Sequence, residues 1–223
     1  TIMIANTAGP SPGSMNFRSR SQLLHLSRTE SENALAKIEP WKAPKAAKSQ
    51  PKETRRPDVI FVPTPQEVVD KMLELAEVTK DDIVYDLGCG DGRIVVTAAK
   101  KFGCTAIGYD IDPRRIKESL ENVEKNNVAD LVQIKQEDIF TLDLSKANVI
   151  TLYLLPELNV KLIPQLQKLK PGSRIVSHDF AMRGVKPEQV VEVTSGQNGY
   201  GHTVFLWRTP LQMVTEGQSD GWE

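Results

Sequence analysis

The chain is poor in the residues that mark disulfide-rich and membrane-spanning proteins. It has two cysteines among 223 residues, too few for a disulfide framework and without the spacing of a metal site. Cys89 and Cys104 both lie in apolar segments, which favours reduced, buried thiols, and no metal is expected. No apolar run reaches the length of about 18 residues that a membrane-spanning helix needs, so no membrane span is expected.

Basic and acidic residues are nearly equal in number, and the formal net charge is -1. Residues 1–58 hold ten Lys and Arg against five Asp and Glu, whereas the rest holds 18 basic and 24 acidic residues, a balance of -6. A mildly acidic folded part argues against a broad phosphate-binding face, so no nucleic-acid partner is expected. The 39% of hydrophobic and 26% of charged residues are typical of a soluble globular protein.

Residues 1–58 lack a sustained apolar period and are rich in Ser, Pro, Lys and Ala, as in a disordered tail or linker. The segment SMNFRSRSQLLHLSRTE has three arginines and no acidic residue before Glu30, a pattern that also resembles an organelle transit peptide. A cytoplasmic and an organellar location therefore both stay open. A single domain is expected over residues 59–210, followed by a C-terminal tail at 211–223.

Beyond residue 59, short apolar runs alternate with segments of helical period. Thr64 and Pro65 suit the N-cap and the first position of a helix. Strands are expected over 82–87, 105–110, 131–136, 148–154 and 173–180, and helices over 92–102, 113–127 and 156–169. This alternation predicts a doubly wound, mostly parallel sheet of the α/β class. Two last runs, 189–195 and 201–209, flank a short Gly/Asn loop and predict an antiparallel hairpin.

The segment VYDLGCGDGRIVV, residues 84–96, places Gly88, Gly90 and Gly92 in the first strand-to-helix turn. Ligands of open α/β sheets bind at the carboxyl ends of the strands, and glycine lets a ligand approach the main chain closely. The Gly-x-Gly-x-Gly spacing is tighter than the dinucleotide pattern, which favours a smaller ligand without phosphate. A plain tight turn is the alternative interpretation. Asp91 is interpreted as the cap of the following helix. Arg93 is interpreted as an exposed helix residue, and pairing with a carboxylate of the ligand is the alternative.

Acidic residues follow the next two expected strands. Asp110, at the end of the second strand, can accept hydrogen bonds from both hydroxyls of a ribose. A helix cap is the alternative for Asp110, although Asp112 is better placed for that role. Ile111 could cover an adenine face or belong to the core. Asp138 or Glu137, after the third strand, could meet the adenine amino group, and a solvated loop carboxylate is the alternative.

The run Asp86-x-Gly88-x-Gly90-x-Gly92, together with Asp110 and Asp138, resembles the class I S-adenosylmethionine-dependent methyltransferases over about residues 62–209. The resemblance implies a Rossmann-like, seven-stranded sheet of order 3-2-1-4-5-7-6, with strand 7 antiparallel. It also implies S-adenosylmethionine as cofactor, with the glycine turn, Cys89 included, under the methionine part. Asp86 would then hold the cofactor's amino group and Asp110 its ribose.

The methyl acceptor is less well marked. The segment TLYLLPEL departs from the Asn/Asp-Pro-Pro-Tyr/Phe motif of DNA and glutamine amino-methyltransferases. Tyr153 and Glu157 are the polar candidates near this segment, and Tyr153 and His178 are the candidate catalytic residues. A plain strand tyrosine and a structural histidine are the alternatives. The entry segment FVPTP is similar to that of small protein-lysine methyltransferases of mitochondrial membrane proteins, with Phe61 in place of Tyr.

That resemblance implies methyl transfer to a protein lysine. A small-molecule O- or N-methyltransferase and a non-catalytic scaffold that binds the cofactor are alternatives. A nicotinamide-dependent oxidoreductase is disfavoured by the glycine spacing and the closing hairpin.

Overall fold

The computed structural model describes residues 61–196 and 199–214. The predicted N-terminal tail and most of the predicted C-terminal tail lie outside the described residues, so the domain boundaries stay predictions. Among the described helices, none combines the length and the apolar character that crossing a membrane requires.

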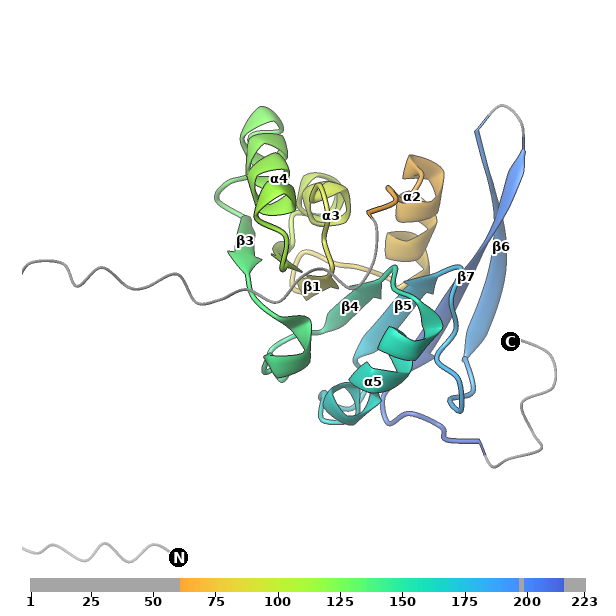
Figure 1. Cartoon of the computed structure of the whole chain (residues 1–223). Coiled ribbons are helices and arrows are strands. Elements are labelled where there is room, and N and C mark those ends of the chain that lie inside the picture. The colour runs from red at the N-terminus through yellow and green to blue at the C-terminus, as the bar shows by residue number, and fades with distance from the viewer. Residues whose placement is uncertain (1–60, 197–198, 215–223) are drawn as a thin grey trace, which may run out of the picture. The chain divides into compact units, whose positions relative to one another are not determined.

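The described residues form a seven-stranded sheet with the order β3-β2-β1-β4-β5-β7-β6 (Figure 1). The strands are β1 (Ile83–Leu87), β2 (Thr105–Asp110), β3 (Val132–Gln136), β4 (Val149–Leu152), β5 (Arg174–His178), β6 (Gln189–Ser195) and β7 (Tyr200–Arg208). Strands β1 to β5 pair in parallel, and β7 runs antiparallel to both β5 and β6. The predicted α/β class, strand order and closing hairpin are confirmed.

Helices cover both faces of the sheet (Figure 1). The helices are α2 (Gln66–Leu75), α3 (Arg93–Phe102), α4 (Pro113–Lys125) and α5 (Pro156–Leu166), with a short 3-10 helix η1 (Ile139–Thr141) between β3 and β4. Because strand side chains alternate between the faces, Val84 packs with α2 and α3, whereas Tyr85 and Leu87 pack with α5. Because β1 pairs in parallel with both β2 and β4, the carboxyl ends of these three strands lie at the same edge of the sheet.

Of the two predicted helix N-caps, one is confirmed and the other is wrong. Asp112 caps α4 as expected, since its carboxylate accepts a hydrogen bond from the Arg114 amide at 2.9 Å. The prediction that Thr64 caps the first helix is wrong: α2 begins at Gln66, after Pro65 at the N-cap. The hydroxyl of Thr64 lies instead 3.3 Å from Nδ1 of His178, a residue distant in the sequence.

Candidate functional site

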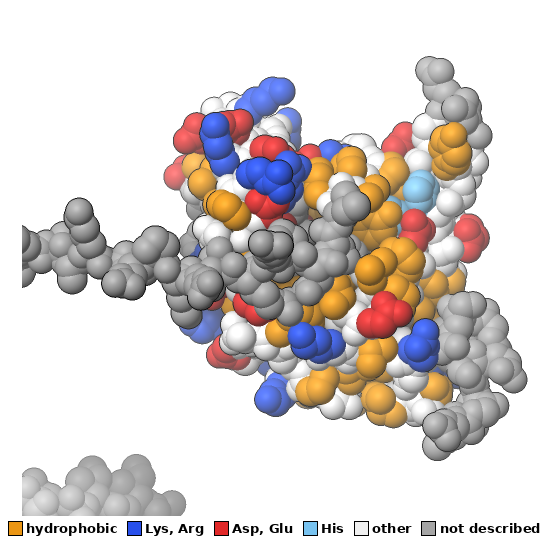
Figure 2. All heavy atoms as spheres, in the orientation of Figure 1, with side chains coloured by type: hydrophobic (Ala, Val, Ile, Leu, Met, Phe, Trp, Pro, Cys, Tyr) orange, Lys and Arg blue, Asp and Glu red, His pale blue; other side chains and the backbone are white. Residues whose placement is uncertain are grey.

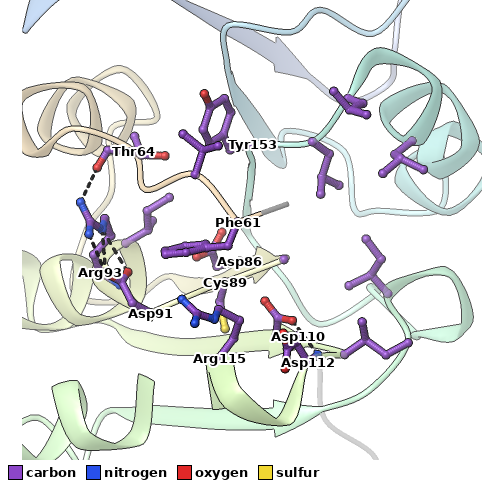
Figure 3. A pocket seen from close by; sticks show the side chains of 18 of the residues that line it. Phe61, Thr64, Asp86, Cys89, Asp91, Arg93, Asp110, Asp112, Arg115 and Tyr153 are labelled. Carbon is purple, nitrogen blue, oxygen red and sulfur yellow. Dashed lines mark hydrogen bonds and ion pairs between the residues drawn. The ribbon is translucent and has the colours of Figure 1, made fainter. Parts of the chain in front are cut away.

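A cavity of about 840 Å³ lies at the carboxyl ends of the parallel strands (Figure 3). It brings together most of the residues predicted for the site. The predicted residues that line it are Asp86, Gly88, Cys89, Asp110, Ile111, Asp138 and Tyr153. Gly90 and Gly92 belong to the same turn, and His178 is not among the described lining residues.

The three glycines of the turn all have positive φ angles, of 90°, 55° and 76° in chain order. A Cβ atom added to Gly90 would lie 2.1 Å from Cε2 of Phe61, whose ring occupies the middle of the cavity view (Figure 3). A Cβ atom on Gly92 would lie 2.8 Å from Cβ of Ser119 in α4. Helix packing therefore explains why Gly92 has no side chain, whereas at Gly90 the ring of Phe61 takes the place of a side chain.

The carboxylate of Asp110 is fixed at the tip of β2. Its Oδ2 accepts a hydrogen bond from the Gly90 amide and its Oδ1 one from the Asp112 amide, each at 2.9 Å. Each oxygen keeps a second lone pair for a ligand. Ile111 lies beside it in the wall, and Asp138 accepts a hydrogen bond from the Phe140 amide at 3.0 Å. The structure thus places both predicted carboxylates at the cavity.

Asp86 is buried, and only one of its two carboxylate oxygens has a hydrogen-bond partner among the described residues. Its Oδ1 accepts a hydrogen bond from the Thr151 hydroxyl at 2.7 Å, but its buried Oδ2 has no hydrogen-bond partner among the described residues. Burial raises the pKa of Asp86 to about 7, the Thr151 hydrogen bond opposes this rise, and the nearby Asp110 and Asp91 charges add to it. An unpaired buried carboxylate oxygen is costly, and a ligand ammonium would relieve that cost.

The entry segment is bound to the glycine turn through Arg93. This side chain donates hydrogen bonds to the Asp91 carboxylate at 2.6 Å and to the Thr64 carbonyl at 2.8 Å. The prediction of an exposed helix arginine is wrong, because the side chain is 31% exposed and its guanidinium pairs with Asp91. Asp91 accepts a hydrogen bond from the Arg93 amide, but the N-cap position of α3 is Gly92.

Phe61 lines the cavity, a role that the sequence did not predict. In the sequence it stood out only because it replaces the Tyr of a family motif. The Arg115 guanidinium lies over its ring, 4.6 Å from the centroid, within the range of a cation–π contact. The aromatic residue in FVPTP could have suggested a role at the site. Nothing in the sequence showed that its ring would lie against the glycine turn.

Tyr153 lines the cavity away from the glycine turn, and His178 lies directly behind it. Their rings are 3.9 Å apart between centroids, and Tyr153 faces the cavity while His178 is fully buried behind it. Burial lowers the pKa of His178 to about 4, an effect that Asp179 opposes and His202 reinforces. Burial also raises the pKa of Tyr153. The catalytic roles of both residues stay predictions.

Known proteins are similar to this chain in sequence and fold. The family model of the ANTKMT methyltransferase domain matches residues 86–189. A protein-lysine N-methyltransferase of Saccharolobus islandicus is 50% identical over 153 residues, which cover 68% of this chain and 94% of the relative. A human lysine N-methyltransferase of ATP synthase is 26% identical over 131 residues, 58% of this chain and 55% of the relative.

A solved structure gives the same result. The crystal structure described as an RNA methyltransferase from Salinibacter ruber in complex with S-adenosyl-L-homocysteine is 45% identical, with a TM-score of 0.62. The match covers 72% of this chain and 100% of that one. The chain therefore belongs to the class I S-adenosylmethionine-dependent methyltransferases. It is an enzyme that uses S-adenosylmethionine as its methyl donor.

Proposed function

We propose that the enzyme methylates the ε-amino group of lysine in a protein. The observation that carries this proposal is the 50% identity to a protein-lysine N-methyltransferase across 94% of that relative. In this proposal the cofactor's ammonium pairs with Oδ2 of Asp86, its ribose hydroxyls donate to Asp110, and its methionine part passes over Gly90. The unpartnered oxygen of Asp86 and the fixed carboxylate of Asp110 support this placement.

The acceptor end of the cavity has the chemistry that a lysine side chain needs. Aromatic rings of Tyr153 and Phe180 line it, with their centroids 6.0 Å apart, and rings of this kind bind both an aliphatic stem and a cationic head. An apolar channel also lowers the pKa of a lysine amine, which must lose its proton before it can react. Bound S-adenosylmethionine supplies a methyl group activated by sulfonium, and the neutral amine takes that methyl while the carbon–sulfur electron pair stays on sulfur.

The surface around the cavity suits a macromolecular acceptor. Val62 and Leu155 line the cavity, and their side chains are 57% and 44% exposed. Hydrophobic side chains gather on the same face between α2 and α5, with charged groups interspersed (Figure 2). An exposed apolar rim of this kind is typical of sites that contact another protein.

A second candidate acceptor is RNA, which is favoured by the description of the Salinibacter ruber relative as an RNA methyltransferase. The charge distribution favours protein instead, since residues 59–223 hold 18 basic and 24 acidic side chains. Specific binding to an RNA backbone rests mainly on lysine and arginine.

Labelling separates the two acceptors. The purified enzyme is incubated with a cell extract and S-adenosylmethionine that carries an isotopically labelled methyl group. We expect the label to be protease-sensitive and RNase-resistant, and to appear in methylated lysine after acid hydrolysis. The Asp110→Ala variant is the matched control, because it should bind the donor about 100-fold more weakly. Label that RNase removes would contradict the lysine proposal, and so would label confined to small molecules.

The raised pKa of Asp86 predicts a pH dependence of cofactor binding. An ammonium pairs with the ionised carboxylate, so affinity should fall as pH is lowered through about 7. The ionised fraction drops about eightfold between pH 7.5 and pH 6, so Kd for S-adenosylhomocysteine should rise roughly five- to tenfold. Isothermal titration calorimetry measures this. Asp86→Asn should bind weakly at both pH values without that slope, whereas a pH-independent wild-type Kd would contradict the assignment.

A further inference from the structure

A cluster of two histidines and one aspartate lies outside the cavity, at the end of β5. Nε2 of His178 is 3.0 Å from Nδ1 of His202, and Oδ2 of Asp179 is 3.1 Å from the first and 3.2 Å from the second nitrogen. Three potential ligand atoms thus form a nearly equilateral triangle. No role in binding the cofactor or the acceptor accounts for it.

The outer atoms of the cluster already have partners. Nδ1 of His178 lies 3.3 Å from the Thr64 hydroxyl, and Nε2 of His202 lies 2.9 Å from the Ser195 hydroxyl. When each ring donates its proton to its hydroxyl, the lone pairs of both rings point into the triangle. Hydrogen-bonded outer nitrogens of this kind orient the histidine ligands of metal sites.

The carboxylate is held in place by the backbone. Asp179 has a φ of 58°, a left-handed conformation that turns its side chain back toward the two rings. Its Oδ1 accepts a hydrogen bond from the Thr203 amide at 2.9 Å, which leaves Oδ2 directed at both histidines. Two imidazole nitrogens and one carboxylate oxygen therefore converge, and no single hydrogen can satisfy all three contacts between them.

We propose that His178, Asp179 and His202 bind one divalent transition-metal ion of the zinc class, which fixes β5 to β7 behind Tyr153. Metal–ligand bonds of about 2.0–2.2 Å place neighbouring ligand atoms roughly 3.0–3.5 Å apart, close to the separations in the cluster. Histidine nitrogen and carboxylate oxygen are ligands that such an ion accepts. The His178 side chain is fully buried and those of Asp179 and His202 are 29% and 17% exposed, so the ion can enter from one side.

The sequence predicts no metal because the ligands come from two different strands. In the antiparallel β5–β7 pair, His178 lies opposite Val204, so His202, two residues earlier, points to the same face. Asp179 follows β5 directly. The proposed site does not depend on which acceptor is methylated, and it assigns the ion a positioning role behind the cavity wall.

Cobalt titration tests the site, since Co²⁺ binds zinc-type ligands and gives a visible absorption. After treatment with a chelator, the full chain should bind one equivalent of Co²⁺, and Zn²⁺ should displace it. The variants His202→Gln and Asp179→Asn should lose this binding at least about 100-fold, a difference near 2.7 kcal/mol. His25→Ala is the matched control, because His25 is the third of the chain's three histidines and should be dispensable.

A measurement on the wild-type chain avoids any folding defect of the variants. In ¹⁵N-labelled protein, Zn²⁺ should shift the ring-nitrogen signals of two of the three histidines at one equivalent. The absence of saturable one-equivalent binding in the wild type would overturn the proposal. Cobalt binding that survives in both cluster variants, or that His25→Ala removes, would overturn it as well.

Discussion

Gly90→Ala should lower the affinity for S-adenosylhomocysteine by at least about 100-fold, a difference near 2.7 kcal/mol. The added methyl group would lie 2.1 Å from the ring of Phe61, which lines the cavity. The proposed path of the cofactor's methionine part passes through the same space. Titration calorimetry on the purified variant measures the loss.

Two further variants separate the possible causes of that loss. Gly103 has a similar positive φ of 69°, but a Cβ atom there meets nothing within 4 Å, so Gly103→Ala should bind normally. The double variant Phe61→Ala/Gly90→Ala removes the clash with the ring but not the obstruction of the ligand. Its affinity should stay low. Restored binding in the double variant would show that Gly90 serves only to accommodate Phe61.

Asp110→Ala should weaken cofactor binding by about 100-fold or more. The change removes two hydrogen bonds from ribose hydroxyls to a charged acceptor, each worth roughly 1.5–3 kcal/mol. Because the same carboxylate holds the Gly90 and Asp112 amides, a thermal melt must first show that the variant is folded. Asp138→Ala is the comparison within the same cavity. It should lower the affinity only about tenfold, since it removes one contact, the one predicted with the adenine amino group.

A ligand analogue makes the Asp110 experiment specific. S-adenosylhomocysteine without its two ribose hydroxyls should bind the wild-type enzyme far more weakly than the complete ligand. In Asp110→Ala the two ligands should differ by only a few-fold, because the acceptor of both hydroxyls is absent. Equal discrimination by the wild type and the variant would assign the ribose to another residue.

The sequence predicts most of the fold because its signals are local. Alternating strand and helix periods lead to the parallel sheet, and the family resemblance gives the strand order that the structure confirms. Asp86 and Asp110 are recognisable for the same reason, since each lies in the last two residues of an apolar strand that precedes a helix. Their convergence at one edge follows from the parallel arrangement of the strands.

Contacts between distant segments could not be predicted in this way. Thr64 looks like a helix cap, and only the packing of the entry segment brings its hydroxyl to His178. The approach of His202 to His178 depends on the register of a hairpin, which periodicity alone does not set. Likewise, an oxygen of Asp86 without a partner emerges only when every neighbouring donor has been placed.

A crystal structure of the enzyme with S-adenosylhomocysteine tests the central claim most directly. The account predicts the ligand's amino group within hydrogen-bond distance of Oδ2 of Asp86, its ribose hydroxyls on Asp110, and its homocysteine chain against Gly90. A ligand bound with its ribose away from Asp110, or with its amino group directed away from Asp86, would contradict the account.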